Sequence, residues 1–248
     1  MAAFFFSDVH LGLGSRSEEK AKENGLLAFL EEIRPETEQL FIVGDLFDFW
    51  FDYATVIPRG YHRTLAALQA FTDGGKPVHY LLGNHDCWMG DFFETEIGVV
   101  LHRDPFEATV QGRRVFIHHG DGLADNDTGY RLIRPILRNP LAIRAYRWLH
   151  PDIGVRLARG TSRSSREYTT NKHYGEESGM LREAERMIAA GVQIVIMGHH
   201  HKPARVDTGG GVYLNLGDWI TYNSYGRMEN GVIELRTWNG HREAGHGG

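Results

Sequence analysis

Five short apolar runs, each followed within two residues by glycine, aspartate, asparagine or histidine, constrain the fold of this 248-residue chain more than any other feature. Runs of this length that end in turn-forming residues are typical of strands buried inside a protein. The runs cover residues 3–6, 40–43, 78–82, 115–117 and 194–197.

Helical patterns separate the first three of these predicted strands. Leu26, Leu30 and Ile33 repeat on one face of a helix, and apolar residues recur at the same spacing over residues 65–71. Alternating strands and helices predict a layered α/β core, and such folds place their sites at the carboxyl ends of the strands. The polar residues that follow the runs therefore stand where a site is expected.

Each polar motif, taken alone, has an ordinary structural explanation. Asp8 and His10 suit a turn after an edge strand, and residues 44–45 and 83–84 are common turn pairs. His119 could be a buried histidine whose hydrogen bonds are satisfied. All five strand ends carry such residues, however, and packing does not require them at every one. The joint pattern favours a functional site.

Three consecutive histidines, His199, His200 and His201, follow the last predicted strand. Side chains alternate along an extended segment, so His199 and His201 point to one side and His200 points to the other. We therefore expect two ligands from this triplet, with His200 as a bystander.

Seven candidate ligands follow from the strand ends: two carboxylates, one amide and four imidazoles. They are Asp8, His10, Asp45, Asn84, His119, His199 and His201. The set is too large for one tetrahedral zinc, but mixed nitrogen and oxygen ligands suit manganese, iron or zinc at higher coordination. If one carboxylate bridges, the seven residues serve two ions, and two ions about 3.5–4 Å apart are a standard device for attacking phosphate esters. The sequence predicts a binuclear metallohydrolase acting on phosphate.

Composition narrows the class of protein. The formal net charge of -5 argues against a general nucleic-acid binder. Cys87 is the single cysteine, so no intrachain disulfide can form and a reducing compartment fits. The N-terminus lacks a basic signal-peptide region, and no segment approaches the ~20 apolar residues of a membrane span. We expect one large core and a soluble cytoplasmic protein.

A basic segment interrupts the α/β alternation between the fourth and fifth strands. Residues 131–172 contain ten basic and two acidic residues, interleaved with apolar ones. The segment reads as short helices broken at Pro135, Pro140 and Pro151. Beside a phosphate site, it indicates an anionic substrate with an apolar part, or an anionic membrane surface. The alternative is a solvated basic face over an ordinary core.

In order along the chain, the motifs DxH, GDxxD, GNHD, HGD and GHxH resemble the calcineurin-like metallophosphoesterase superfamily. The resemblance implies a four-layer α/β/β/α sandwich, with two mixed or mainly parallel sheets between helices. It implies one metal ion on Asp8, His10, Asp45 and His201. It implies a second ion on Asp45, Asn84, His119 and His199, with Asp45 bridging.

The GNHD motif also supplies two catalytic candidates. By the same resemblance, His85 would lie over the phosphate without touching metal. As imidazolium it could stabilise developing charge or protonate the leaving oxygen, with Asp86 fixing its orientation. Asp48 would either form a hydrogen bond with the backbone near the site or contact the substrate.

A narrower resemblance rests on longer phrases between residue 3 and about residue 238. GDLFDFWFDY, GNHDCWM, HGDGLADNDTGY, RWLHPDIG and LNLGDWITY are similar to UDP-2,3-diacylglucosamine diphosphatases of lipid A biosynthesis, most of all to a Bacteroidetes-like branch. That family cleaves the pyrophosphate of UDP-2,3-diacylglucosamine to UMP and 2,3-diacylglucosamine 1-phosphate (lipid X), with metal-bound water attacking the α-phosphorus. Members of that family commonly use Mn²⁺. They are peripheral proteins at the cytoplasmic face of the inner membrane. The implied substrate contacts are Asn84, His85, Asp127, Tyr130, Arg159 and Ser162.

The expected organisation is one domain over residues 1–238, with a helical cap insert at about 122–175 and a flexible tail at 239–248. The better-known branch of the diphosphatases carries arginine where this chain has His85. A soluble phosphodiesterase or nucleotide pyrophosphatase is therefore a second hypothesis, and it predicts a mostly polar cap cleft. A non-enzymatic member is a third, and it would be expected to have lost ligands.

Overall fold

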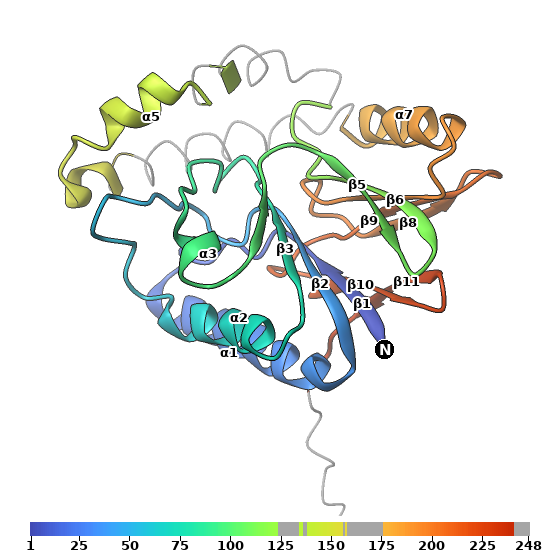
Figure 1. The fold of residues 1–248 in the computed structure, drawn as a ribbon, viewed down its shortest axis with the longest axis horizontal. Helices are drawn as coiled ribbons and strands as arrows, with labels where there is room; N and C mark the ends of the chain where they lie inside the picture. The colour runs from blue at the N-terminus through green and yellow to red at the C-terminus, as the bar shows by residue number, and fades with distance from the viewer. Residues whose placement is uncertain (124–133, 136–137, 156, 158–175, 241–248) are drawn as a thin grey trace, which may run out of the picture.

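The computed structural model describes residues 1–123, 134–135, 138–155, 157 and 176–240. Two β-sheets pack against each other, and helices cover the outer face of each, so the predicted four-layer sandwich is confirmed (Figure 1). The helices with defined bounds are α1 (Arg16–Ile33), η1 (Arg34–Glu36), α2 (His62–Asp73), α3 (Phe92–Thr95), α5 (Pro140–Tyr146) and α7 (Glu176–Ala189).

The first sheet has six strands in the order β11-β10-β1-β2-β3-β4. They are β1 (Ala2–Phe6), β2 (Thr37–Val43), β3 (Val78–Leu81), β4 (Val100–His102), β10 (Ser224–Glu229) and β11 (Val232–Thr237). Strands β1 to β4 are parallel, whereas β10 runs antiparallel to both β1 and β11. The four parallel strands therefore direct their carboxyl ends to one edge.

The second sheet has five strands in the order β5-β6-β7-β9-β8. They are β5 (Phe106–Val110), β6 (Arg113–His118), β7 (Ile194–Met197), β8 (Ala204–Asp207) and β9 (Val212–Asn215). The central strands β6, β7 and β9 are parallel, and the two edge strands are antiparallel to their neighbours. Both sheets are thus mixed.

Successive side chains of β1 point to opposite faces of the first sheet, so the strand contributes to two layers of the core. Ala3 and Phe5 are buried between the two sheets, whereas Phe4 and Phe6 face the core beneath α1 and α2. Both faces of the strand are covered, so the whole run is apolar. A separate core beneath α7 contains Met180 and covers the outer face of the second sheet.

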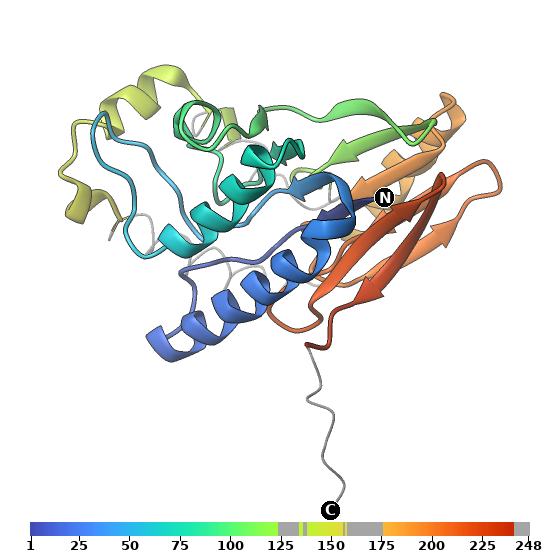
Figure 2. The same ribbon diagram turned by 60° about the horizontal axis from the view of Figure 1, so that its bottom comes forward.

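The predicted helical faces are confirmed. Leu26, Leu30 and Ile33 are buried on α1, and the apolar residues of α2 are buried on the same side of the first sheet. The two helices run side by side (Figure 2). A capping box between Ser15 and Glu18 fixes the start of α1 by satisfying backbone N–H groups there.

In the segment predicted as a cap insert, the described residues include α5 and a helical stretch at 151–155, away from the sheets at one end of the molecule (Figures 1 and 2). Pro140 and Pro151 begin these helices, because proline lacks an N–H and suits the first turn. No helix within the described ranges combines the length and apolar character that crossing a bilayer requires. Most of the predicted tail, residues 241–248, lies outside the described residues.

Candidate metal centre

The ends of β1, β2, β6 and β7 converge at one place, where backbone hydrogen bonds join their loops. The Asp8 N–H donates to Gly44 O (3.2 Å), and the Gly198 N–H donates to His119 O (2.9 Å). The His199 N–H donates to the Asp8 carboxylate (2.8 Å), which links the two sheets. Loops that lie far apart in the sequence are therefore joined by hydrogen bonds at one place.

Five of the seven candidate ligands have a backbone conformation that L-residues rarely adopt. Their positive φ angles are 53° for Asp8, 49° for His10, 54° for Asp45, 68° for His199 and 59° for His201. Each such residue costs of order 1–3 kcal/mol, and such strain persists where the surrounding structure enforces it, often at functional sites. An ordinary turn does not explain five such residues in one place.

Two glycines allow the loops to approach closely. A Cβ at Gly83 would overlap the Asp45 carboxylate, and a Cβ at Gly198 would lie 2.5 Å from the Asp8 carboxylate. These glycines precede the asparagine and histidine motifs, so the side chains they approach are themselves candidate ligands. Glycine is therefore needed at both positions to make room for the candidate ligands.

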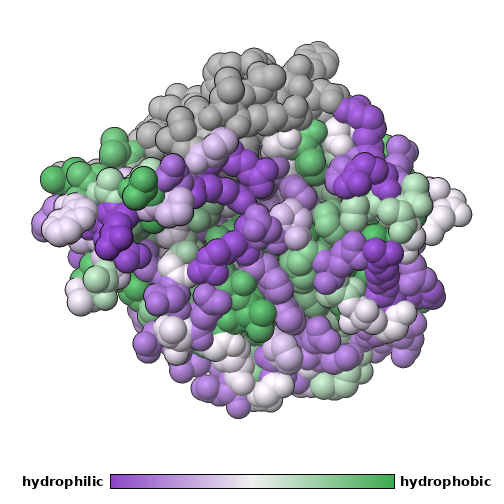
Figure 3. All heavy atoms as spheres, turned by 45° about the horizontal axis from the view of Figure 1, so that its top comes forward, coloured by the Kyte–Doolittle hydropathy of each residue, from purple (hydrophilic) through white to green (hydrophobic). Residues whose placement is uncertain are grey.

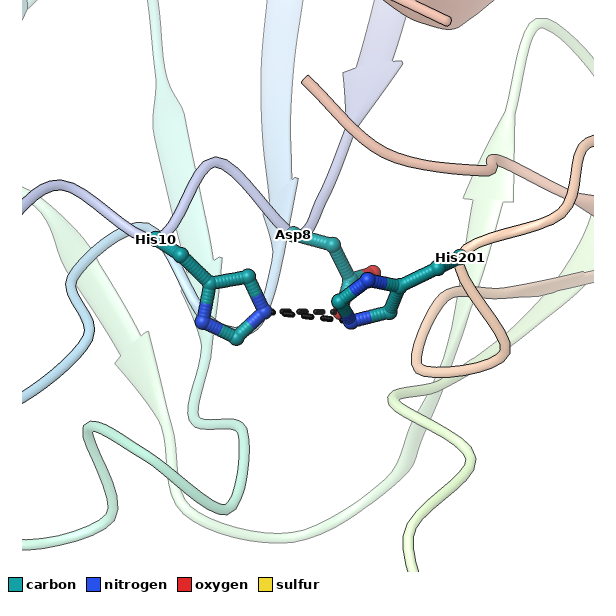
Figure 4. A group of neighbouring side chains, drawn as sticks. All are labelled: Asp8, His10 and His201. Atoms are coloured by element: carbon teal, nitrogen blue, oxygen red, sulfur yellow. Dashed lines mark hydrogen bonds and ion pairs between the residues drawn. The ribbon is translucent and has the colours of Figure 1, made fainter. Parts of the chain in front are cut away.

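Asp8, His10 and His201 form the first group of ligand atoms (Figure 4). The Nε2 atoms of His10 and His201 lie 3.2 Å apart. Asp8 Oδ1 lies 3.3 Å from Nε2 of His201 and 3.7 Å from Nε2 of His10. Within the part of the chain that the structure describes, this buried oxygen accepts no hydrogen bond.

Asp45, His119 and His199 form the second group. Nε2 of His119 lies 3.3 Å from Asp45 Oδ2 and 3.1 Å from the amide oxygen of Asn84. Asp45 Oδ2 also lies 3.8 Å from Nε2 of His10. The structure therefore brings all seven predicted ligands together, with Asp45 between the two groups.

The donor set fits divalent cations. In the first group, two ring nitrogens and a carboxylate oxygen converge, and a cation would satisfy the oxygen that no hydrogen bond reaches. In the second group, Nδ1 of His119 donates to Val43 O (2.8 Å), which makes Nε2 the ring atom that faces the other ligands. Nitrogen and oxygen donors together suit transition metals such as Mn²⁺ or Zn²⁺.

The charge states of the two carboxylates and of His199 suit metal binding. Burial raises the pKa of any carboxyl, yet Asp8 and Asp45 keep pKa values below the ordinary one because His10 and His119 lie beside them. Burial, reinforced by His119, lowers the pKa of His199 to about 4. The carboxylates are therefore ionised and His199 is neutral at pH 7, as metal coordination requires. Burial alone would lower the pKa values of His10, His119 and His201, but the carboxylates of Asp48, Asp45 and Asp218 beside them raise those values, that of His201 to about 10. Metal binding must therefore displace protons from these three rings.

His85 is oriented by Asp48, which corrects the expectation that Asp86 does this. Nδ1 of His85 donates to the backbone oxygen of Asp48 (3.1 Å) and lies 3.6 Å from its carboxylate. The Asp86 carboxylate instead accepts hydrogen bonds from the Tyr80 hydroxyl and the Gly83 N–H (2.8 Å). Asp86 is fully buried beneath the turn, so it shapes the turn rather than the His85 ring.

Two further aspartates at the centre had no role assigned from the sequence. Asp121 pairs with Arg134 (3.5 Å) and Arg138 (3.6 Å), which connects the cap insert to the site. Asp218 lies 3.5 Å from Nδ1 of His201. The LNLGDWITY phrase contains Asp218, but nothing in its local pattern indicates that it meets His201.

A cavity of about 700 Å³ lies between α5 and the loop that follows His85. Apolar and cationic side chains share its walls. They include Leu82, Trp88, Met89, Pro140, Ile143, Arg103, Arg138, Arg144 and Arg147, and Asp104 adds one carboxylate. Such a space suits a ligand that is both anionic and apolar.

Comparison with known proteins supports the same interpretation. The calcineurin-like phosphoesterase family matches residues 1–203. A Porphyromonas gingivalis protein named UDP-2,3-diacylglucosamine hydrolase is 32% identical, over 94% of this chain and 96% of that protein. A Pseudomonas aeruginosa protein of the same name is 31% identical, over 98% of each chain. With its seven ligand-type residues converging at the strand ends, this chain belongs to the calcineurin-like phosphoesterase family.

Proposed function

We propose that this protein hydrolyses the pyrophosphate of UDP-2,3-diacylglucosamine, releasing UMP and lipid X for lipid A biosynthesis. One observation carries the proposal: the loop that carries Asn84 and His85 also lines, with Leu82 and residues 87–90, a cavity with both apolar and cationic walls. The substrate has a pyrophosphate and two acyl chains, so it needs both features. The names of the relatives support the same substrate.

The proposed metal ligands are those of the two groups described above. Asp8, His10 and His201 would hold one ion, His119 and His199 with Asn84 would hold the other, and Asp45 would bridge. When bound, two divalent ions, Mn²⁺ in our proposal, would activate water for attack and neutralise the phosphoryl oxygens.

The protein's own residues would orient the phosphate and donate a proton to the leaving oxygen. Nδ1 of His85 donates to the backbone oxygen of Asp48, so a proton transferred to the leaving oxygen would come from Nε2 of the imidazolium form. Asn84 and His85 are the proposed substrate contacts within the described residues. The other four, Asp127, Tyr130, Arg159 and Ser162, lie outside the described residues and stay predictions.

The second hypothesis, a soluble phosphodiesterase or nucleotide pyrophosphatase, predicts a mostly polar cleft. The apolar part of the cavity wall, with Trp88, Met89 and Ile143, favours an acylated substrate. A non-enzymatic role predicts lost ligands, and all seven are present.

Hydrolysis in ¹⁸O-labelled water tests the proposed reaction. Attack at the α-phosphorus places the label in UMP, and mass spectrometry of both products detects it. Label in lipid X would contradict attack at the α-phosphorus. Failure of the Mn²⁺-loaded protein to release UMP would contradict the function itself.

Membrane contact through the cap insert is also part of the proposal, at the cytoplasmic face of the inner membrane. Leu141, Trp148, Ile153 and Leu157 are 54–88% exposed. Figure 3 shows apolar surface at the edge of the molecule where the cap lies. The described cap residues from 134 to 157 also include four arginines and one aspartate, a balance that suits anionic headgroups.

Trp148→Ala is expected to weaken binding to vesicles that contain phosphatidylglycerol by roughly 10- to 100-fold. Burying one large apolar side chain contributes roughly 1.5–3 kcal/mol, which sets this range. Co-sedimentation over a lipid titration measures the effect. Val232→Ala is the control, since Val232 is 57% exposed on β11. Equal binding by both variants would contradict membrane contact through Trp148.

A further inference from the structure

We propose that Asp218 is a positioning residue that fixes the ring of His201 and makes Nε2 its metal-binding atom. Asp218 Oδ2 lies 3.5 Å from Nδ1 of His201. On the opposite side of the ring, Nε2 lies 3.3 Å from Asp8 Oδ1 and 3.2 Å from Nε2 of His10. The ring thus stands between one carboxylate outside the metal centre and the ligand atoms within it.

The exposure of His201 explains why an orienting partner is needed. The side chains of His10 and His119 are 1% exposed, so packing holds their rings. The side chain of His201 is 36% exposed and lies at the rim of the centre. An imidazole with that much open space can rotate, and only a specific partner at Nδ1 keeps Nε2 aimed at the metal.

Asp218 is itself held rigidly by its own loop. Its Oδ1 accepts hydrogen bonds from the backbone N–H groups of Ile220 (3.2 Å), Thr221 (2.8 Å) and Tyr222 (3.1 Å). These bonds occupy one oxygen and leave Oδ2 for His201. Asp218 is 3% exposed, so little solvent competes for that oxygen.

The next residue ties this loop to the metal centre. The backbone N–H of Trp219 donates to Asp8 O (3.1 Å), and its indole N–H donates to Ser224 O (3.0 Å). The Trp219 ring is buried against Phe6 and Phe29 in the core beneath α1. The loop between β9 and β10 therefore holds Asp218 at a fixed distance from Asp8 and, through it, from His201.

Another histidine at the centre uses a comparable partner. Nδ1 of His119 donates to a backbone carbonyl, that of Val43. Nδ1 of His10 faces the carboxylate of Asp48 at 3.7 Å, too far for a hydrogen bond, and packing holds that ring. At His201 the partner is an anion, which increases the electron-donating strength of Nε2 as well as fixing the ring.

Asp218→Asn tests this role with the smallest change in shape. The amide oxygen can still accept the three backbone hydrogen bonds, but the amide nitrogen would face the Nδ1–H of His201, donor against donor. We expect one of two Mn²⁺ ions to bind about 10- to 100-fold more weakly, the usual effect of losing such a partner. Calorimetric titration of chelator-treated protein with Mn²⁺ measures both ions.

Electron paramagnetic resonance gives a second readout that a purely structural role would not move. With two equivalents of Mn²⁺, the wild type is expected to show a coupled pair, whereas D218N shows mainly an isolated ion. Asp207→Asn is the matched control, because Asp207 is exposed and pairs with Arg205 on β8. The melting temperature of the chelator-treated protein checks the fold of each variant.

Two results would overturn the assignment. One is D218N binding both ions as tightly as the wild type. The other is equal weakening of both ions together with a lower melting temperature, which would mean that Asp218 only stabilises the loop. The inference rests on the metal centre of the proposed function and not on its substrate. If the wild type binds two ions but does not cleave the acylated substrate, the proposed function fails and this role stands.

Discussion

Asp45→Asn is expected to lower kcat/KM for the proposed substrate by at least about 1,000-fold, or about 4 kcal/mol of transition-state stabilisation. The Asp45 carboxylate lies between the two ligand groups, 3.3 Å from His119 and 3.8 Å from His10. The nearby histidines outweigh the effect of burial and keep its pKa below the ordinary value, so it supplies a full negative charge at pH 7. Asparagine keeps the shape and removes this charge, so both ions should bind more weakly.

Steady-state kinetics and Mn²⁺ stoichiometry together measure this effect. Asp207→Asn, the same change on an exposed strand, should leave both unchanged. A D45N protein that binds two ions and retains activity within tenfold of the wild type would contradict a bridging role for Asp45.

His85→Asn is expected to lower kcat by about 100- to 1,000-fold while both Mn²⁺ ions still bind. The hydrogen bond from Nδ1 of His85 to Asp48 O keeps one proton on Nδ1, so only the imidazolium form carries a second, transferable proton on Nε2. Losing a positioned proton donor costs a factor of this size. Comparison of kcat with Mn²⁺ titration separates loss of proton transfer from loss of metal.

The separation matters because His10, Asp48 and His85 also bring ligand atoms within 4.8 Å of one another. If His85 were a metal ligand, H85N would lose an ion along with activity. His200→Asn is the matched control, since His200 lies in the same triplet as two proposed ligands but should affect neither quantity. Loss of an ion in H85N would contradict the assignment of His85 to proton transfer.

The local pattern of apolar residues predicts the layers of this fold, but it does not predict which strands pair within a sheet. The run at 3–6 is apolar on both faces, and the structure covers it on both faces. Strand β10 pairs with β1 although more than 200 residues separate them, as in the pair Ala3 and Met228. No short-range spacing encodes such a contact, since it forms only when the whole sheet assembles.

The same limit applies within the site. His200 lines a different hollow, with Lys202 and Tyr213, in line with the prediction that it is not a ligand. The extended segment assumed for that prediction is wrong, because His199 and His201 have positive φ angles. Ligand-type residues at strand ends are predictable because parallel strands bring their ends together. Their orienting partners are not, since Asp48 and Asp218 meet their histidines only through loop geometry.

Hydrolysis of UDP-2,3-diacylglucosamine beside UDP-N-acetylglucosamine and bis(p-nitrophenyl) phosphate tests the central claim most directly. Each compound is incubated with chelator-treated protein before and after Mn²⁺ is restored, and UMP or nitrophenol is quantified. The account predicts rapid, Mn²⁺-dependent release of UMP from the acylated compound and little turnover of the other two. Equal or faster turnover of the unacylated compounds would contradict a role for the apolar cavity wall and favour the soluble phosphodiesterase.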